Sequence, residues 1–210
     1  MDKHYLIGIC GGSASGKTFL LQELMRSFPK GSVTLISQDN YYFDLDDQVK
    51  DEFGQVNFDH PRAVNLKLLK EHLEALMTGH PVSIREYHFN NPAKEFRMIT
   101  YRPAPIILVE GMFVYYREDI RDMFNLKLFV DAEPHEKFAR RIQRDREERG
   151  YPLEDVMQQY RQFVIPMYRR FVEPFKYEAD MILNSHENYR ASIRVLENHI
   201  RYIIGCKEKN

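Results

Sequence analysis

An eight-residue stretch near the start of the chain has the residue types and spacing of a phosphate-binding loop. It fits the pattern G-x-x-x-x-G-K-[ST] and consists of Gly11, Gly12, Ser13, Ala14, Ser15, Gly16, Lys17 and Thr18. In such a loop, backbone N–H groups and the positive end of the following helix face the β- and γ-phosphates of a nucleotide. Lys17 adds a positive charge, and the Thr18 hydroxyl can reach Mg²⁺. The loop predicts binding of a nucleoside triphosphate, ATP or GTP, together with Mg²⁺.

Two acidic residues at the ends of apolar stretches are candidates for the chemistry beside this loop. Asp39 follows the stretch 33–37, so we expect it at the carboxyl edge of a sheet, where α/β proteins bind ligands. A carboxylate there can accept a proton from an attacking hydroxyl or help to hold Mg²⁺, although aspartate is also common as a turn cap. Glu110 ends the apolar stretch that begins at Pro105 and is the candidate on the metal side.

Five arginines lie close together in one segment of helical character: Arg140, Arg141, Arg144, Arg146 and Arg149. A spacing of four aligns Arg140 with Arg144 on one helix face, and a spacing of three aligns Arg141 with Arg144. One such face can close as a lid, at about residues 140–151, over a phosphoryl group during its transfer. The alternative is a solvated helix whose arginines pair with the neighbouring acids, Asp145, Glu147 and Glu148.

The elements that must position these residues alternate between strand and helix. Apolar strand-like stretches occupy residues 5–10, 33–37, 106–110, 126–131 and 181–183. Helical patterns cover 19–28, 62–77, 134–149, 153–176 and 187–204, the fourth interrupted by Pro166 and Pro174. This alternation predicts an α/β fold of the P-loop NTPase type, a parallel sheet flanked by helices. Residues 82–89 and 96–101 predict a β-hairpin outgrowth, with 90–94 as its connection.

Length and composition favour one domain spanning residues 1–210. The 30 Lys and Arg residues against 31 Asp and Glu give a net charge of −1, so no overall field favours nucleic acid or anionic membranes. No apolar stretch approaches the ~20 residues that span a bilayer. Cys10 and Cys206 predict neither a disulfide framework nor a metal site. We therefore expect a cytoplasmic protein without a nucleic-acid or membrane partner.

Short motifs are spread along nearly the whole chain. They are residues 11–18, Ser-Gln-Asp-Asn-Tyr-Tyr at 37–42, Asn-Phe-Asp-His-Pro at 57–61, Tyr-His-Phe at 87–89, Glu-Gly at 110–111, Lys-Leu-Phe-Val-Asp at 127–131, Arg-Arg at 140–141, Arg-Asp at 144–145, Glu-Arg-Gly at 148–150 and Gln-Tyr at 159–160. Taken together, these motifs resemble the uridine-cytidine kinases. The resemblance implies a kinase for pyrimidine ribonucleosides, a homotetramer and a cytoplasmic role in pyrimidine salvage.

The resemblance also implies roles for individual residues. Asp39 would be the base for the 5′-hydroxyl, and Asp59 would bind the ribose diol. The nucleoside pocket would be lined by Tyr42, Phe58, Tyr87 and Gln159. Arg141 would lie on the substrate side or the phosphate side, and Arg144 and Arg149 would be lid residues that contact the nucleotide. Thr18 with Glu110 would hold magnesium.

The chemistry of the residues supports a nucleoside acceptor. A carboxylate such as Asp59 can accept two hydrogen bonds from vicinal hydroxyls, whereas a monophosphate acceptor calls for arginines there. Tyr42, Phe58 and Tyr87 can stack on a base, although aromatic residues near a sheet are more often part of the core. These features argue against a nucleoside monophosphate kinase.

Two positions depart from the family pattern, and both concern the base. Pro92 stands where the family commonly has a histidine that contacts the pyrimidine, and Tyr151 stands where an arginine usually follows Gly150. Two other functions remain open: a phosphoribulokinase-like or other small-molecule kinase, and a non-catalytic nucleotide-responsive binding protein. The second of these functions is disfavoured because non-catalytic nucleotide-binding proteins often lose a catalytic carboxylate. Here the residues of the site are intact: Lys17, Thr18, Asp39 and Glu110.

Overall fold

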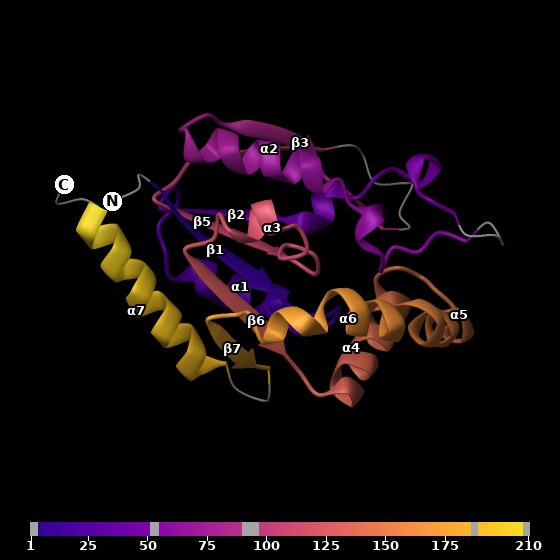
Figure 1. The fold of residues 1–210 in the computed structure, drawn as a ribbon. Coiled ribbons are helices and arrows are strands. Elements are labelled where there is room, and N and C mark those ends of the chain that lie inside the picture. Colours follow the sequence, from indigo (N-terminus) through magenta and orange to yellow (C-terminus); the bar gives the residue numbers. More distant parts are fainter. Residues whose placement is uncertain (1–3, 51–54, 90–96, 186–188, 208–210) are drawn as a thin grey trace.

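The computed structural model describes residues 4–50, 55–89, 97–185 and 189–207. Its centre is a parallel sheet in the order β2 (Val33–Ser37), β5 (Ile106–Gly111), β1 (Tyr5–Cys10), β6 (Leu126–Asp131) and β7 (Met181–Asn184). Figure 1 shows the sheet with helices on both sides. The predicted α/β fold with a parallel sheet is confirmed.

Seven α-helices accompany the sheet in the described part of the chain. They are α1 (Lys17–Arg26), α2 (Leu66–Met77), α3 (Glu118–Arg121), α4 (Pro134–Glu147), α5 (Leu153–Gln159), α6 (Ile165–Phe171) and α7 (Arg190–Lys207). Helix α2 begins later than predicted, because Pro61–Ala63 form a 3₁₀ turn and the Asn65 side chain caps the helix by accepting from the N–H of Leu68. Helix α4 ends at Glu147, so Arg149 lies beyond it.

The strand sequences are nearly continuous apolar runs, because both faces of the sheet are buried. On one face, Leu6 and Ile107 pack with residues of α2 and α3. On the other face, Ile7 and Leu108 pack with residues of α1 and α7. Alternate residues of one strand therefore belong to two separate cores, which gives the molecule three layers.

The predicted hairpin is a separate two-stranded antiparallel sheet of β3 (Val82–Arg85) and β4 (Met98–Tyr101). Its buried residues Ile84 and Tyr101 join the core on the α2 side. The strands are shorter than predicted, since residues 86–89 are not strand. The predicted connection 90–94, with Pro92, and the start of the second predicted strand lie outside the described residues.

The α-helix predicted over 153–176 is interrupted near both prolines, by a π-helical turn before Pro166 and by a 3₁₀ turn that contains Pro174. Residues Tyr160–Val164 form a π-helical turn between α5 and α6, closed by a hydrogen bond from the N–H of Ile165 to the oxygen of Tyr160. Proline has no N–H to donate, and the wider turn admits it without ending the helix. Pro174 lies in the 3₁₀ turn Glu173–Lys176 that follows α6.

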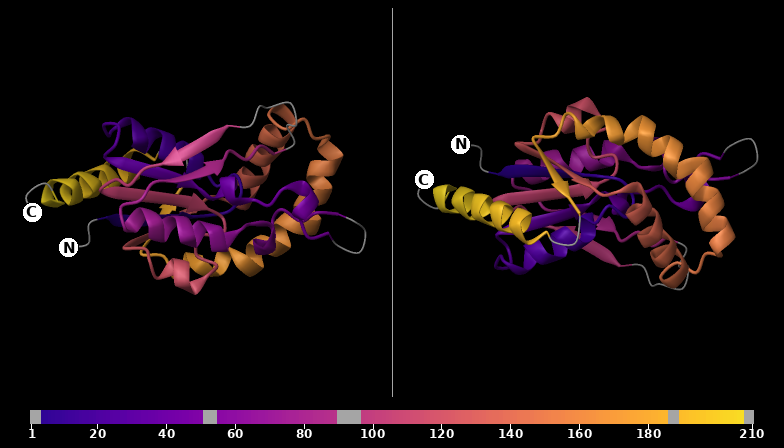
Figure 2. Two further views of the ribbon diagram at one scale, coloured as in Figure 1. Left: turned by 90° about the horizontal axis from the view of Figure 1, so that it is seen from above. Right: turned by 90° about the horizontal axis from the view of Figure 1, so that it is seen from below.

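The two ends of the sheet differ in what surrounds them. The start of β1 and the end of α7 lie together at the amino edge, as both views of Figure 2 show. The segment after β2 and helices α4 and α5 extend beyond the carboxyl edge. Helix α7, like every other helix in the described ranges, is too short or too polar to cross a membrane.

Candidate active site

A cavity of about 410 Å³ lies at the carboxyl edge of the sheet. It brings together segments that are far apart in sequence: the phosphate-binding loop, the segments after β2 and before α2, the end of β5, and helices α4 and α5. The predicted site residues in its lining are Ser13, Ala14, Ser15, Gly16, Lys17, Thr18, Asp39, Tyr42, Phe58, Asp59, Glu110, Arg141, Arg144, Arg149 and Gln159.

The phosphate-binding loop connects β1 to α1, as the sequence predicts. Gly16 precedes α1 in the left-handed region, with φ of 99°, and a Cβ atom there would lie 2.6 Å from the Tyr189 hydroxyl. At Gly11, a Cβ atom would lie 2.4 Å from the carbonyl oxygen of Val130 on the neighbouring strand. Glycine is therefore required at both positions, and the loop stays close to the sheet and to the start of α1.

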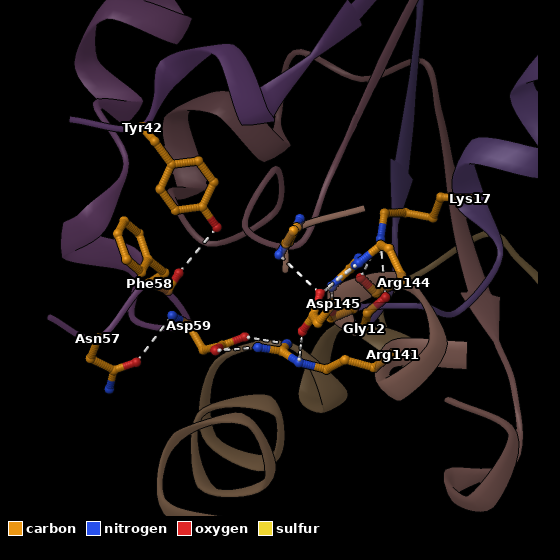
Figure 3. Close-up of polar contacts among 12 residues, drawn as sticks. Gly12, Lys17, Tyr42, Asn57, Phe58, Asp59, Arg141, Arg144 and Asp145 are labelled. Atoms are coloured by element: carbon orange, nitrogen blue, oxygen red, sulfur yellow. Dashed lines mark hydrogen bonds and ion pairs between the residues drawn. The ribbon is translucent and has the colours of Figure 1, made fainter. Parts of the chain in front are cut away.

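Lys17 is buried and folds back over its own loop. Its Nζ donates to the carbonyl oxygens of Gly11 at 2.9 Å and Gly12 at 3.1 Å. Figure 3 shows this contact at the opposite side of the site from Tyr42 and Asp59. A buried ammonium group beside the phosphate-binding loop, at the start of a helix, is suited to an anion.

Asp39 and Glu110 form an acidic pair beside the loop. The cap of the turn Gln38–Tyr41 is the Ser37 hydroxyl, which accepts from the Asp39 N–H, so the Asp39 carboxylate is not needed as a cap. Ser37 also donates to the Glu110 carboxylate. Burial first, and then the nearby Asp39, raises the pKa of Glu110 above its ordinary value, while Lys17 acts in the opposite direction.

The donor set fits a magnesium ion bound together with a nucleotide. Two carboxylates that repel each other and the Thr18 hydroxyl are hard oxygen ligands of the kind that Mg²⁺ takes. Among the described residues, no group of three or more His, Cys, Asp or Glu side chains forms a metal site by itself. Mg²⁺ at such sites is usually held by one or two carboxylates, with phosphate oxygens and waters completing the shell.

Asp59 stands on the other side of the cavity and faces Arg141. Its backbone N–H donates to the Asn57 side chain at 3.0 Å, which fixes the turn before α2. Its carboxylate receives Arg141 Nη1 at 3.3 Å and Nη2 at 3.5 Å (Figure 3). The expected ribose ligand is thus a carboxylate that already has a partner on α4.

Four aromatic rings form a wall beside Asp59. We call Tyr42, Phe58, Tyr87 and Phe89 the aromatic wall; the ring contacts among them span 4.9 to 6.0 Å between centroids. Tyr42 also donates to the Phe58 carbonyl oxygen at 3.1 Å. Phe89 lines the cavity, whereas Tyr87 is not in its lining and contacts the rings of Tyr42 and Phe89. Phe89 was missed as a site residue, although it is part of the motif Tyr-His-Phe.

Three arginines converge on one buried carboxylate. We call Arg141, Arg144 and Arg149 the arginine cluster; each forms an ion pair with Asp145, at 3.1, 2.9 and 3.3 Å respectively. The Asp145 side chain is only 3% exposed, so the solvated-helix alternative does not apply to this face of α4. The sequence signal for Asp145 was its spacing of four from both Arg141 and Arg149.

The other two predicted arginines are not part of the arginine cluster. Arg140 lines the cavity and donates to Ser185 after β7, at 2.8 Å to the hydroxyl and 3.0 Å to the carbonyl oxygen. Arg146 is exposed. Tyr151 also lines the cavity, and burial raises the pKa of its hydroxyl, while Arg149 opposes the shift.

Comparison with known proteins gives close relatives along nearly the whole chain. The model of the Phosphoribulokinase / Uridine kinase family matches residues 6–191. A uridine kinase of Deinococcus deserti is 38% identical over 200 residues, covering 95% of this chain and 97% of that protein. A uridine kinase of Brevibacillus brevis is 39% identical over 209 residues, covering 100% and 98%.

Solved structures share the fold at low sequence identity. A possible uridine kinase from Bacillus stearothermophilus superposes with a TM-score of 0.62 at 16% identity, covering 87% of this chain and 89% of that one. Phosphoribulokinase from Rhodobacter spheroides gives a TM-score of 0.63 at 20% identity, covering 88% and 71%. Sequence identities this low show a shared fold and nothing about the activity.

Proposed function

The chain belongs to the Phosphoribulokinase / Uridine kinase family, and we propose that it transfers the γ-phosphate of ATP or GTP to the 5′-hydroxyl of a pyrimidine ribonucleoside, uridine and/or cytidine. The enzyme class, a phosphotransferase of the nucleoside kinase type, follows from relatives that are 38% and 39% identical over nearly the full chain. We choose a nucleoside as the acceptor because one cavity is lined by the phosphate-binding loop, by Asp59 and by three rings of the aromatic wall.

The two sides of the cavity suit the two substrates. The phosphate-binding loop and Lys17 would receive the triphosphate of the donor. The acceptor end, which we define as Asp59 with the cavity-lining residues of the aromatic wall, would take the nucleoside, with the ribose diol on the carboxylate and the base on the rings. Gln159, in the same lining, offers an amide to the edge of a base.

In the proposed reaction, Asp39 accepts the proton of the 5′-hydroxyl as its oxygen forms the bond to the γ-phosphorus. The bond between that phosphorus and the bridging oxygen breaks, and the nucleoside diphosphate leaves. Lys17 and the arginine cluster stabilise the charge on the transferring group. Thr18 and Glu110, with Asp39 nearby, would hold Mg²⁺, which would offset the negative charge of the phosphates.

The same family contains kinases with other acceptors, and the acceptor end distinguishes them. A sugar phosphate needs basic groups for its own phosphate, whereas Asp59 places a carboxylate at this end and Arg141 is already paired with it. The aromatic wall has no evident partner in a small sugar. These features favour the nucleoside over a phosphoribulokinase-like acceptor.

A panel assay tests the proposal. Purified enzyme with Mg²⁺ and either ATP or GTP is offered uridine, cytidine, purine nucleosides, free ribose and ribulose 5-phosphate, and products are identified by mass. We expect a nucleoside 5′-monophosphate from at least one pyrimidine ribonucleoside. If the enzyme phosphorylates ribulose 5-phosphate and none of the nucleosides, the proposed function is wrong.

We also propose that the enzyme works in the cytoplasm, in pyrimidine salvage, as a homotetramer. The support is the resemblance to the uridine-cytidine kinases. Light scattering of the purified protein checks the tetramer directly: the proposal requires four times the chain mass of 25.1 kDa.

A further inference from the structure

The arginine cluster is built around a carboxylate that the proposed reaction does not use. Asp145 lies on α4, is buried, and pairs with three guanidinium groups. A buried carboxylate in such a set is required to offset the repulsion among the arginines. Burial and then the nearby Arg144 lower the pKa of Arg149, while Asp145 acts against that shift.

Each member of the arginine cluster also makes a second contact, and each of these contacts lies in a different part of the cavity. Arg141 reaches Asp59 at the acceptor end. Arg144 donates to the Ser13 hydroxyl of the phosphate-binding loop at 3.2 Å. The guanidinium of Arg149 lies 4.2 Å from the centre of the Phe89 ring in the aromatic wall.

Through the three arginines, the Asp145 side chain is therefore linked to the carboxylate of Asp59, to the aromatic wall and to the phosphate-binding loop. Figure 3 shows Asp145 and Arg144 between the loop and the pair of Arg141 and Asp59. Three guanidinium groups against the two carboxylates leave one positive charge in excess within this set, which is available to an incoming phosphate. A ligand that orders one arginine lowers the cost of ordering the others, which makes two ligands cooperative.

We propose that Asp145 is a positioning residue that couples the two substrate sites. By holding the arginine cluster together, it makes binding of the nucleoside favour binding of the phosphate donor, and the reverse. This inference rests on the proposed function, since it requires that a nucleoside occupies the acceptor end. Asp145 itself transfers no proton and no phosphoryl group.

The test measures coupling between the sites in binding, without turnover. The Kd of uridine and of cytidine is measured by calorimetry with and without a non-hydrolysable ATP analogue and Mg²⁺. In the wild type we expect the analogue to tighten nucleoside binding by about 5-fold or more, the usual lower range of such coupling. In Asp145→Asn, which keeps the shape and removes the charge, we expect that factor to fall to about 1, while the nucleoside still binds alone.

A matched control comes from the same helix. Glu147 is exposed and pairs with Gln143, away from the arginine cluster. Glu147→Gln should keep the wild-type coupling factor. Coupling that persists in a folded Asp145→Asn protein would overturn the inference.

A second variant keeps the test decisive if Asp145→Asn does not fold. Ser13→Ala removes the contact of Arg144 with the loop and buries no new charge. We expect it to lower the coupling factor and to leave the Kd of the nucleoside alone unchanged; an unchanged factor would overturn the inference. A wild type that makes nucleotide but shows no coupling would overturn the inference and leave the proposed function standing, whereas a wild type that binds no nucleoside would overturn both.

Discussion

The carboxylate of Asp59 and the guanidinium of Arg141 face each other at 3.3 Å, although 82 positions separate them in the chain. The pair joins the segment before α2 to helix α4 at the acceptor end. Asp59 is buried, and its two oxygens each receive one N–H of the same guanidinium at 3.3 and 3.5 Å. A carboxylate has about four acceptor sites, and Arg141 uses one on each oxygen, so Asp59 retains capacity for further donors.

We predict that this pair makes the enzyme select ribose over deoxyribose. A 2′-deoxy acceptor lacks one donor to a buried carboxylate, and a hydrogen bond to a charged group contributes about 1.5–3 kcal/mol. The kcat/KM for a ribonucleoside should exceed that for the matched deoxyribonucleoside by about 10-fold or more. In Asp59→Ala the two values should approach each other. Equal values in the wild type would remove Asp59 from the sugar site.

For Asp39 we predict a catalytic defect with binding retained. Asp39→Asn keeps the size of the side chain and removes the group that accepts the proton, so kcat should fall by roughly 10² or more. The Kd of the nucleoside, measured by calorimetry, should stay close to the wild-type value. Asp44→Asn serves as the control, because Asp44 is an exposed partner of Arg85 outside the cavity lining. An unchanged kcat in Asp39→Asn would contradict the assignment as base.

For Glu110 we predict opposite effects on stability and activity. Its raised pKa means that the folded protein disfavours the charged carboxylate, so the ionised group costs stability at pH values above its pKa in the folded protein. Without Mg²⁺ at neutral pH, Glu110→Gln should therefore have a higher Tm than the wild type. The gain should shrink as the pH falls, because the wild-type carboxyl then becomes protonated and neutral.

The same variant should lose activation by magnesium, since the amide is a weaker ligand than the carboxylate. The concentration of Mg²⁺ required for half-maximal activity should rise, and adding excess Mg²⁺ should stabilise the wild type more than the variant. Melting curves at several pH values, with and without Mg²⁺ and a nucleotide, check both effects. A variant that is less stable at every pH would contradict the charge-burial argument.

The sequence was sufficient to predict the sheet and the phosphate-binding loop. Strands buried on both faces are nearly continuous apolar runs, so β1, β2 and β6 begin and end where the sequence predicts. The loop follows from the identity of its residues, because only glycine fits at Gly11 and Gly16 beside the neighbouring strand and Tyr189.

The site was harder to predict wherever tertiary packing decides. Helical spacing shows which residues share a face of α4, but not that this face is buried, so the sequence alone leaves open that Asp145 lies on a solvated surface. Tyr87 and Phe89 follow the end of β3, where the alternation of a strand no longer applies, and only packing decides that Phe89 lines the cavity. The π turn before Pro166 has no signal in a pattern of hydrophobic residues.

The last prediction concerns the base. Tyr151, where the resemblance to the uridine-cytidine kinases leads us to expect an arginine, lines the cavity, and its backbone N–H donates to the Asp145 carbonyl oxygen at 3.0 Å. A site that forms hydrogen bonds to the polar edge of a base rejects bases without matching groups, because buried polar groups are then left unpaired. A site without those donors therefore differs in which bases it accepts. With Gln159 still in the cavity lining, we expect pyrimidine use to be retained and uridine activity to be weaker than cytidine activity or lost.

The Tyr151 hydroxyl can take over part of the role of the missing arginine, so its removal should change the ratio of kcat/KM for cytidine and uridine. Tyr151→Phe removes that hydroxyl and keeps the ring, whereas Tyr177→Phe makes the same change at a tyrosine that is 83% exposed and outside the cavity lining. The ratio should shift in the first variant and stay at the wild-type value in the second. Comparable kcat/KM values for both nucleosides in the wild type, unaltered by Tyr151→Phe, would show that base choice does not depend on Tyr151.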